Sequence, residues 1–318
     1  MRLWQRSMIA LARNEPLKRF IQSRAAMSEL ATRFVGGRDV AEAAETSLSL
    51  RSRGYTASLY YLGEYVEDVS VIKRSVTELL AITGKLAELK LETHISVDPT
   101  QIGYQVNEEM CRDNARIIAQ EIKRIRTGAA ATSGDFLMLD MEDTSVTTAT
   151  IALYGLLRRE SLPAAVTLQA YLFRSEDDLK RIVQGGGAVR LVKGAFAEND
   201  DIAFTRRSDI DRNYLRLAKV MLSDEARSIS FYPAFATHDA GVIDEIVKIA
   251  ARGGWKQGDY EFEMLYGVRR DLQEKLIQRG ERLRLYIPFG RDWWPYAVRR
   301  VGESPRNAEF LLRAVVGI

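Results

Sequence analysis

The alternation of two hydrophobic patterns along the chain constrains its fold most strongly. Eight short apolar runs rich in β-forming residues recur after residue 50, and most are nearly continuous, as is typical of strands buried on both faces. They cover residues 57–65, 94–98, 136–141, 164–172, 189–196, 229–237, 260–266 and 283–289. Segments with helical periodicity lie between and after them, at residues 69–90, 107–126, 146–159, 175–184, 209–225, 240–252, 269–279 and 294–316.

This alternation predicts parallel strands joined by right-handed helical crossovers. Eight repeats favour a closed α/β barrel of the (β/α)8 type over an open sheet, which usually has fewer strands. A doubly wound sheet is the alternative, although no G-x-G-x-x-G motif follows the first strand, which weakens its dinucleotide-binding form. We expect residues 1–50 to form an extra N-terminal helical segment and residues 51–318 to form the barrel domain.

The composition argues against several classes of protein. There are 46 basic and 43 acidic residues, so the net charge of +3 gives no case for nucleic-acid binding. A single cysteine, Cys111, rules out an intramolecular disulfide, and with only two histidines we expect no metal centre. The low cysteine content favours a reducing, cytoplasmic location. No apolar run approaches the ~20 residues that span a bilayer, so only peripheral contact with a membrane stays open.

In a (β/α)8 barrel, chemistry takes place at the carboxyl ends of the strands and in the loops after them. Polar side chains gather at those positions, which predicts a site for a small carboxylate and for a large anionic cofactor. They are Asp98 after the second strand, Asp140, Glu142 and Asp143 after the third, Gln169 and Tyr171 after the fourth, Lys193 after the fifth, and Thr237, His238 and Asp239 after the sixth.

The last predicted helix carries a pair of adjacent arginines. Tyr296, Arg299, Arg300 and Glu303 are spaced so that they share one helix face. Two guanidinium groups there can hold a carboxylate by paired hydrogen bonds, and Glu303 can fix an arginine by a salt bridge. Two tryptophans and a proline directly precede the set, which indicates that this face turns inward.

Two other groups of residues admit several interpretations. The carboxylates of Asp140, Glu142 and Asp143 could perform acid–base chemistry, hold a divalent metal, or compensate a buried arginine such as Arg190. Lys193 could form a Schiff base, as in a lyase, or neutralise an anionic cofactor. The glycine that follows it leaves room for a ligand close to the backbone.

Together, these motifs resemble the monofunctional bacterial proline dehydrogenases, flavin enzymes that oxidise L-proline. The resemblance covers residues 50–317, and the Tyr-x-x-Arg-Arg-x-x-Glu unit is its most specific part. The matching segments are YLGEYV, DFLMLDMED, TLQAYLFRSEDDL, RLVKGAF, AFATHD, FEMLYGVR, LYIPFGRDWWPYAVRR and GESPRN.

The resemblance implies a distorted (β/α)8 barrel that binds FAD, and it implies a role for each matching residue. Arg299 and Arg300 would bind the proline carboxylate, and Asp140 and Arg190 would be the catalytic residues of strands three and five. The substrate pocket would further include Glu303, Tyr296, Tyr286, Leu265, Ala170, Tyr171 and Asp98. The flavin contacts would be Met141, Gln169, Lys193, Gly194, Ala195, Thr237 and His238.

The resemblance also implies the reaction and its partners. L-Proline would become Δ1-pyrroline-5-carboxylate, reduced FAD would pass its electrons to a quinone, and a separate pyrroline-5-carboxylate dehydrogenase would perform the next step.

One position departs from the family pattern, which usually has a lysine where this chain has Asp98. Two neighbouring carboxylates, Asp98 and Asp140, would raise each other's pKa unless a cation such as Lys90 or Arg74 intervened. The departure leaves another cyclic or secondary amino acid as the alternative substrate.

Overall fold

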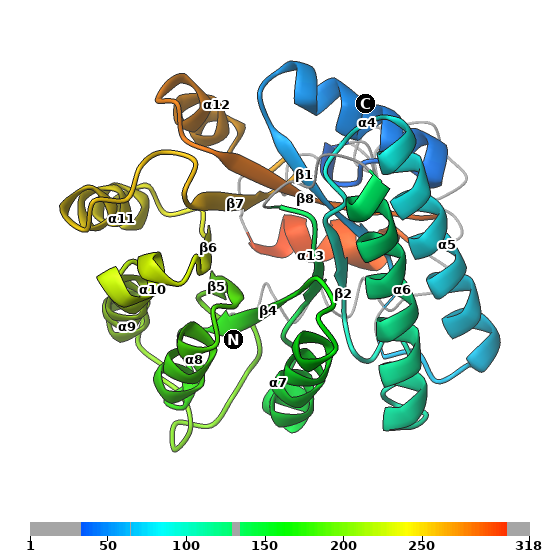
Figure 1. The fold of residues 1–318 in the computed structure, drawn as a ribbon, viewed down its shortest axis with the longest axis horizontal. Coiled ribbons are helices and arrows are strands. Elements are labelled where there is room, and N and C mark those ends of the chain that lie inside the picture. The colour runs from blue at the N-terminus through cyan, green and yellow to red at the C-terminus, as the bar shows by residue number, and fades with distance from the viewer. Residues whose placement is uncertain (1–32, 64, 129–133, 304–318) are drawn as a thin grey trace.

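The computed structural model describes residues 33–63, 65–128 and 134–303, in which eight parallel strands close into a barrel (Figure 1). Each strand pairs with the next along the chain, and β8 pairs with β1 from Thr56 opposite Arg284 to Tyr61 opposite Phe289. This closure confirms the barrel and excludes the open sheet. The strands are β1 (Thr56–Tyr61), β2 (Ile95–Val97), β3 (Leu137–Leu139), β4 (Ala164–Gln169), β5 (Ala188–Val192), β6 (Tyr232–Ala236), β7 (Glu261–Leu265) and β8 (Leu283–Phe289).

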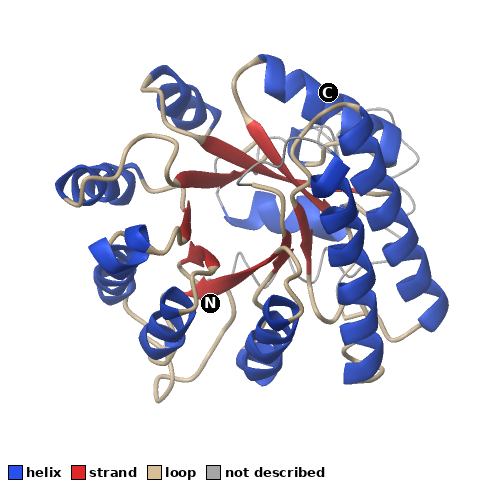
Figure 2. Ribbon diagram, in the orientation of Figure 1, coloured by secondary structure: helices blue, strands red, loops and turns tan. Residues whose placement is uncertain are grey.

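Helices surround the ring of strands (Figure 2). They are α4 (Val40–Ser52), α5 (Val69–Glu88), α6 (Glu108–Gly128), α7 (Thr144–Arg159), α8 (Ser175–Gln184), α9 (Arg207–Met221), α10 (Asp224–Ser228), α11 (Ala240–Arg252), α12 (Arg270–Gln278) and α13 (Trp294–Glu303). Within the described ranges, no helix combines the length and the apolar character that crossing a bilayer requires.

The predicted elements are confirmed with shifted ends. The run predicted as a strand over 164–172 leaves the sheet after Gln169, and the fifth strand ends at Val192, two residues before Gly194 at a φ of 109°. The helix predicted over 209–225 divides in two because the Ser223 hydroxyl accepts a hydrogen bond from the Ala226 N–H and caps α10.

The N-terminal helical segment is described only in part. Helix α4 confirms the helix at its end, whereas residues 1–32 lie outside the described residues, as do residues 304–316 of the last predicted helix. The domain boundary at residue 50 therefore stays a prediction.

The chain just before α4 is hydrogen-bonded to the end of β8. The Gly36 N–H donates to the Pro288 carbonyl at 2.8 Å, and the Gly290 N–H donates to the Gly37 carbonyl at 2.9 Å. A Cβ at Gly36 would overlap the Ile287 side chain, so the close approach requires glycine there.

Charged side chains fill the barrel interior, where branched apolar residues usually dominate. Arg284 is fully buried, and its Nε donates to Glu261 at 2.8 Å. His94 lies between Glu261 and Glu263, and the possible ligand atoms of these three residues are within 4.8 Å of one another. Burial first, and then the charge of Arg284, hold the pKa of His94 well below its usual value. Because arginines already bind both carboxylates, this layer is an ion-pair network around a neutral imidazole.

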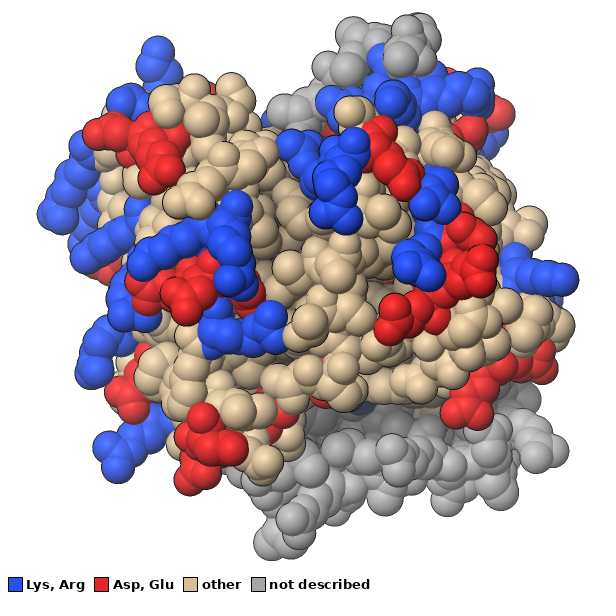
Figure 3. Space-filling model, turned by 60° about the horizontal axis from the view of Figure 1, so that its bottom comes forward, with Lys and Arg blue, Asp and Glu red and all other residues tan. Residues whose placement is uncertain are grey.

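The exposed face in Figure 3 carries lysine, arginine, aspartate and glutamate in a mixed pattern. Among the described residues, surface charges pair along helices, for example Lys85 with Glu88 and Lys248 with Glu245. The face in Figure 3 therefore shows mixed charges and not the single-sign surface that is typical of binding to a phosphate backbone.

Candidate functional site

A cavity of about 530 Å³ opens at the carboxyl ends of the strands, where the sequence predicted the site. Helix α13 crosses this end of the barrel (Figure 1) and contributes Arg300 to the cavity wall. The cavity brings together most of the predicted site residues: Asp98, Asp140, Met141, Gln169, Arg190, Lys193, Gly194, Ala195, Thr237, His238, Leu265, Tyr286 and Arg300.

Arg190 and Asp140 form the centre of the site. The Arg190 guanidinium pairs with Asp140 and, at 2.7 Å, with Glu263, and it also donates to the hydroxyls of Ser58 and Ser96 at 3.2 Å each. Of the three interpretations of the acidic run, charge compensation of Arg190 is the one that the geometry supports for Asp140.

The electrostatics of this centre follow from its burial. Burial raises the pKa of Asp140 and of Glu263, and the attraction of Arg190 opposes that rise. Burial lowers the pKa of Arg190, but the charges of Glu263 and Asp140 outweigh it and raise that pKa above its usual value. The guanidinium therefore stays charged throughout the working pH range.

The other two carboxylates of the acidic run have structural roles. Glu142 is buried and accepts hydrogen bonds from the backbone N–H and the hydroxyl of Thr100. Asp143 caps α7 by accepting from the Ser145 N–H at 2.9 Å. The three acids thus serve three separate purposes.

Tyr286 presents its ring to the cavity and is held at its hydroxyl. That hydroxyl donates to Asp140 at 2.9 Å, and Arg190 lies over the ring at 5.3 Å from its centroid. The ring also stacks on Tyr60, with centroids 5.5 Å apart and planes 28° apart. The Tyr60 hydroxyl in turn donates to Asp98 at 2.6 Å.

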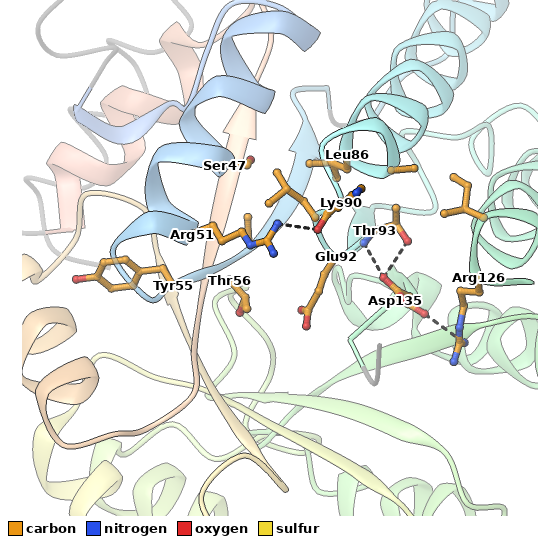
Figure 4. A pocket seen from close by; sticks show the side chains of 14 residues that line it. Ser47, Arg51, Tyr55, Thr56, Leu86, Lys90, Glu92, Thr93, Arg126 and Asp135 are labelled. Atoms are coloured by element: carbon orange, nitrogen blue, oxygen red, sulfur yellow. Dashed lines mark hydrogen bonds between the residues drawn. The ribbon is translucent and has the colours of Figure 1, made fainter. Parts of the chain in front are cut away.

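Lys90 and Arg74, suggested as cations next to Asp98, line other cavities than the one that holds Asp98. Lys90 lines a second cavity, beside the amino ends of β1 to β3, where its carbonyl accepts from Arg51 at 2.8 Å (Figure 4). Arg74 lines a third cavity together with Tyr61 and Glu78. The suggestion that Lys90 or Arg74 stands between Asp98 and Asp140 is therefore wrong, because neither reaches the cavity that holds these acids.

Lys193 and Gly194 follow β5 at the edge of the cavity. The Lys193 ammonium pairs with Asp211 and, at 3.1 Å, with Asp239. Gly194 has a φ of 109°, and a Cβ there would overlap the ring of Tyr171. The ring of Tyr171 therefore packs directly against the Gly194 backbone, an approach that only glycine allows.

His238 is a neutral hydrogen-bond donor. Burial first, and then the positive charge of Arg300, lower its pKa to about 4. Its Nε2 accepts from the Leu265 N–H at 3.0 Å, which places the single ring proton of the neutral form on Nδ1.

The remaining predicted residues lie behind the cavity wall or on α13. Ala170 is buried, and its carbonyl accepts from Asn213 at 2.6 Å, while Tyr171 packs against Gly194. Tyr296 is buried with the Arg300 guanidinium over its ring at 5.1 Å, and Arg299 is half-buried beside it. The side chain of Glu303 lies outside the described residues.

Sequence reasoning missed Tyr60, Thr167 and Glu263, although all three hold predicted residues. Thr167 donates to Asp140 at 3.1 Å, and Glu263 is a main partner of Arg190. The signal was present in β7, where Glu261 and Glu263 alternate with apolar residues, because alternate residues of a barrel strand face the interior.

Comparisons with known proteins agree with this geometry. A family model described as proline dehydrogenase matches residues 43–313. The chain is 30% identical to proline dehydrogenase 2 of Bacillus subtilis strain 168 over 285 residues, which cover 90% of each chain. It is 29% identical to proline dehydrogenase of Deinococcus radiodurans over 319 residues, covering 99% of this chain and 98% of that one.

A solved structure shares the fold. It is proline utilization A (PutA) from Bdellovibrio bacteriovorus, which is 22% identical with a TM-score of 0.76. The match covers 86% of this chain and 32% of that much longer one, so it concerns the barrel alone.

Proposed function

Because the chain belongs to the proline dehydrogenase family, we propose that its cavity holds FAD and that Arg299 and Arg300 bind the carboxylate of L-proline. The enzyme oxidises proline, the first step of proline catabolism, and its family is flavin-dependent in general. The product would be Δ1-pyrroline-5-carboxylate. The single observation that carries the proposal is that Arg300 shares one cavity with the unit of Asp140, Arg190 and Tyr286.

The residues of the cavity fit a flavin. Gly194 lines the cavity without a side chain, and the ring of Tyr171 packs against its backbone. Met141, Ala195 and Leu265 offer apolar contacts for the ring system, and the Nδ1–H of His238 offers a donor. Lys193, between two carboxylates, supplies positive charge next to this wall.

The chain's own residues would bind and orient the substrate. Two guanidinium groups fix a carboxylate in one plane, and the Tyr286 ring, with its hydroxyl held by Asp140, gives the pyrrolidine ring a rigid wall. Leu265 lies on the cavity wall beside the His238 contact. Bound FAD would supply the acceptor for the hydride that leaves the ring carbon next to nitrogen.

Arg190 and Asp140 would act as a rigid charged support. Because Glu263 and Asp140 hold the guanidinium, this charged donor group keeps one position in the cavity wall before a ligand binds. Such preorganised donors stabilise negative charge that develops during a reaction. We therefore assign to Arg190 the stabilisation of the reduced cofactor and to Asp140 the orientation of Tyr286.

The Schiff-base alternative for Lys193 has no support in the geometry. A Schiff base requires the neutral amine as a nucleophile. Here the Lys193 side chain is held in ion pairs with Asp211 and Asp239. The lysine instead contributes charge.

Further steps need partners. We propose that a quinone takes the electrons and that a separate pyrroline-5-carboxylate dehydrogenase consumes the product. We place the enzyme in the cytoplasm, with peripheral contact at the inner face of the cytoplasmic membrane where a quinone is available.

Anaerobic titration of the FAD-loaded enzyme tests the proposal. L-Proline should bleach the flavin absorbance, whereas pipecolate and hydroxyproline should do so less effectively. An enzyme that binds no flavin, or whose flavin proline leaves oxidised, would refute it. Bleaching by pipecolate or hydroxyproline in preference to proline would identify the alternative substrate class that Asp98 suggests.

A further inference from the structure

We propose that the second cavity, beside the amino ends of β1 to β3, is a binding site for an aliphatic carboxylate, that is, an anion with an apolar chain. The proposal is independent of the proposed function, because the cavity assigned to flavin and proline lies at the opposite end of the barrel. The volume of the second cavity, about 530 Å³, lies within the range of about 300–1,000 Å³ that is typical of small-molecule sites.

Three basic side chains from three different segments line the second cavity (Figure 4). Arg51 comes from the last turn of α4, Lys90 follows α5, and Arg126 comes from the last turn of α6. The Arg51 guanidinium donates to the Lys90 carbonyl at 2.8 Å, and the Arg126 guanidinium donates to the Asp135 carbonyl at 3.4 Å. Both acceptors are neutral, so these hydrogen bonds orient the two guanidinium groups without balancing their charge.

Glu92 lines the same cavity, but its charge is already balanced inside the barrel. It pairs with Arg282 at 2.8 Å and with Arg284 at 2.7 Å. Both arginines pair in addition with Glu261, at 3.0 Å and 2.8 Å. Two cations and two anions cancel in this network, so Glu92 leaves the charge of the cavity's own basic side chains uncompensated.

Asp135 is the other carboxylate of the lining, and it is hydrogen-bonded within the wall. It accepts from the backbone N–H of Thr93 at 2.7 Å and from the hydroxyl of the same residue at 3.0 Å. Within the ranges that the structure describes, no carboxylate forms an ion pair with Arg51, Lys90 or Arg126. Three cations therefore stand against one anion in this wall, and the excess positive charge favours an anionic ligand.

The rest of the wall is largely apolar. Tyr55 and Leu86 are buried, and Leu91 and Ile125 are partly buried. An inorganic anion would leave these side chains in contact with water, and an apolar molecule would leave the cations unused. A carboxylate with an aliphatic chain matches both parts of the wall, because a guanidinium binds a carboxylate by charged hydrogen bonds and each buried methylene tightens binding up to about fourfold.

Octanoate is the probe for this site, and calorimetry on the holoenzyme measures its Kd without proline or turnover. 1-Octanol keeps the chain without the charge, and it should bind at least about tenfold more weakly than octanoate. Hexanoate keeps the charge and shortens the chain by two methylenes, and it should also bind about tenfold more weakly.

Variants locate the bound octanoate. Arg51→Met and Arg126→Met should each weaken octanoate binding about tenfold and change the Kd of 1-octanol by less than about threefold, since only charged hydrogen bonds are lost. Lys90→Gly should give a smaller loss in the same direction, and its φ of 54° suits glycine, so the fold should tolerate it. Two controls should leave the Kd unchanged: Lys85→Met removes a positive charge of α5 outside the cavity, and Arg300→Met alters the other cavity.

Absence of octanoate binding, or equally tight binding of 1-octanol, would overturn the proposal. So would a loss of affinity in Arg300→Met with none in Arg51→Met and Arg126→Met, because octanoate would then occupy the other cavity. Should one variant fail to fold, the remaining two decide the matter by the same criterion. Failure of the proposed function has a different signature, a flavin that proline leaves oxidised, and it would not change the octanoate result.

Discussion

Replacing Arg190 by methionine should make the stability of the protein strongly dependent on pH. Arg190 is 3% exposed, and its guanidinium is paired with Asp140 and Glu263. Arg190→Met leaves both carboxylates buried without this cation, and breaking a buried ion pair in this way costs about 3–5 kcal/mol. Burial already raises the pKa of both acids, and loss of the attraction that opposes it raises them further.

The direction of this pH dependence follows from the difference between the pKa values of the two carboxyl groups in the folded and the unfolded state. In the unfolded chain such carboxyl groups have a pKa of about 4. With raised native pKa values, their contribution to stability is fully present below that pH and is lost as the pH rises through the native values. Each carboxyl that is protonated only in the native state contributes about 1.4 kcal/mol per pH unit, so two contribute up to about 2.7 kcal/mol per unit.

Urea unfolding at a series of pH values from about 5 to 8 measures this dependence. The free energy of unfolding of Arg190→Met should fall below the wild-type value by a margin that widens with pH, and adding Glu263→Gln should remove about half of the extra slope. Arg279→Met, which breaks an exposed pair with Asp244, should cost at most about 1 kcal/mol at every pH. A constant difference between Arg190→Met and wild type would refute the reasoning.

Three further predictions concern the site. Arg299→Met and Arg300→Met should each raise the KM for proline about tenfold or more, because paired charged hydrogen bonds are lost; an unchanged KM in both would remove the clamp assignment. Gly194→Ala should lower the flavin content of the purified protein, since the added Cβ would meet the ring of Tyr171 and the φ of residue 194 is positive. Full flavin occupancy in this variant would contradict the assignment of Gly194 to the flavin site. The pKa of His238 is about 4 in the native state and about 6.5 in the unfolded chain. Its neutral form therefore stabilises the fold above pH 6.5 by roughly 3 kcal/mol, and this stabilisation is lost as the pH falls towards 4. His238→Gln should flatten that part of the stability profile, and unfolding curves between those pH values decide it.

The local hydrophobic pattern of the sequence predicts much of the fold. The continuous apolar runs at Leu137–Leu139 and Ala164–Gln169 specify strands buried on both faces, and eight such runs in alternation with helices leave few arrangements. Strand ends were less predictable. Residues 170–172 are as apolar as the strand before them, yet the chain turns there, with the Leu172 N–H donating to the Gln169 carbonyl at 3.2 Å.

A site residue was predictable where its own position at the end of a strand is enough to place it in the site. Asp140, Lys193 and His238 stand at strand ends, and the barrel geometry brings such positions together. Partners contributed by other strands were not predictable in this way. The assignment of Glu263 to Arg190, and of Tyr60 to Asp98, depends on which strands face each other across the barrel, and spacing along the chain does not contain that information.

The backbone bonds from Gly36 and Gly37 to the last strand bear on how the protein can be shortened. The family model begins at residue 43, so a fragment trimmed to the matched range would lose both glycines and with them the hydrogen bonds to Pro288 and Gly290. Helix α13 starts only four residues after Gly290. Trimming the amino terminus would thus loosen the anchor of the arginine-bearing helix, and we expect it to show in substrate affinity before it shows in the helix content of the barrel.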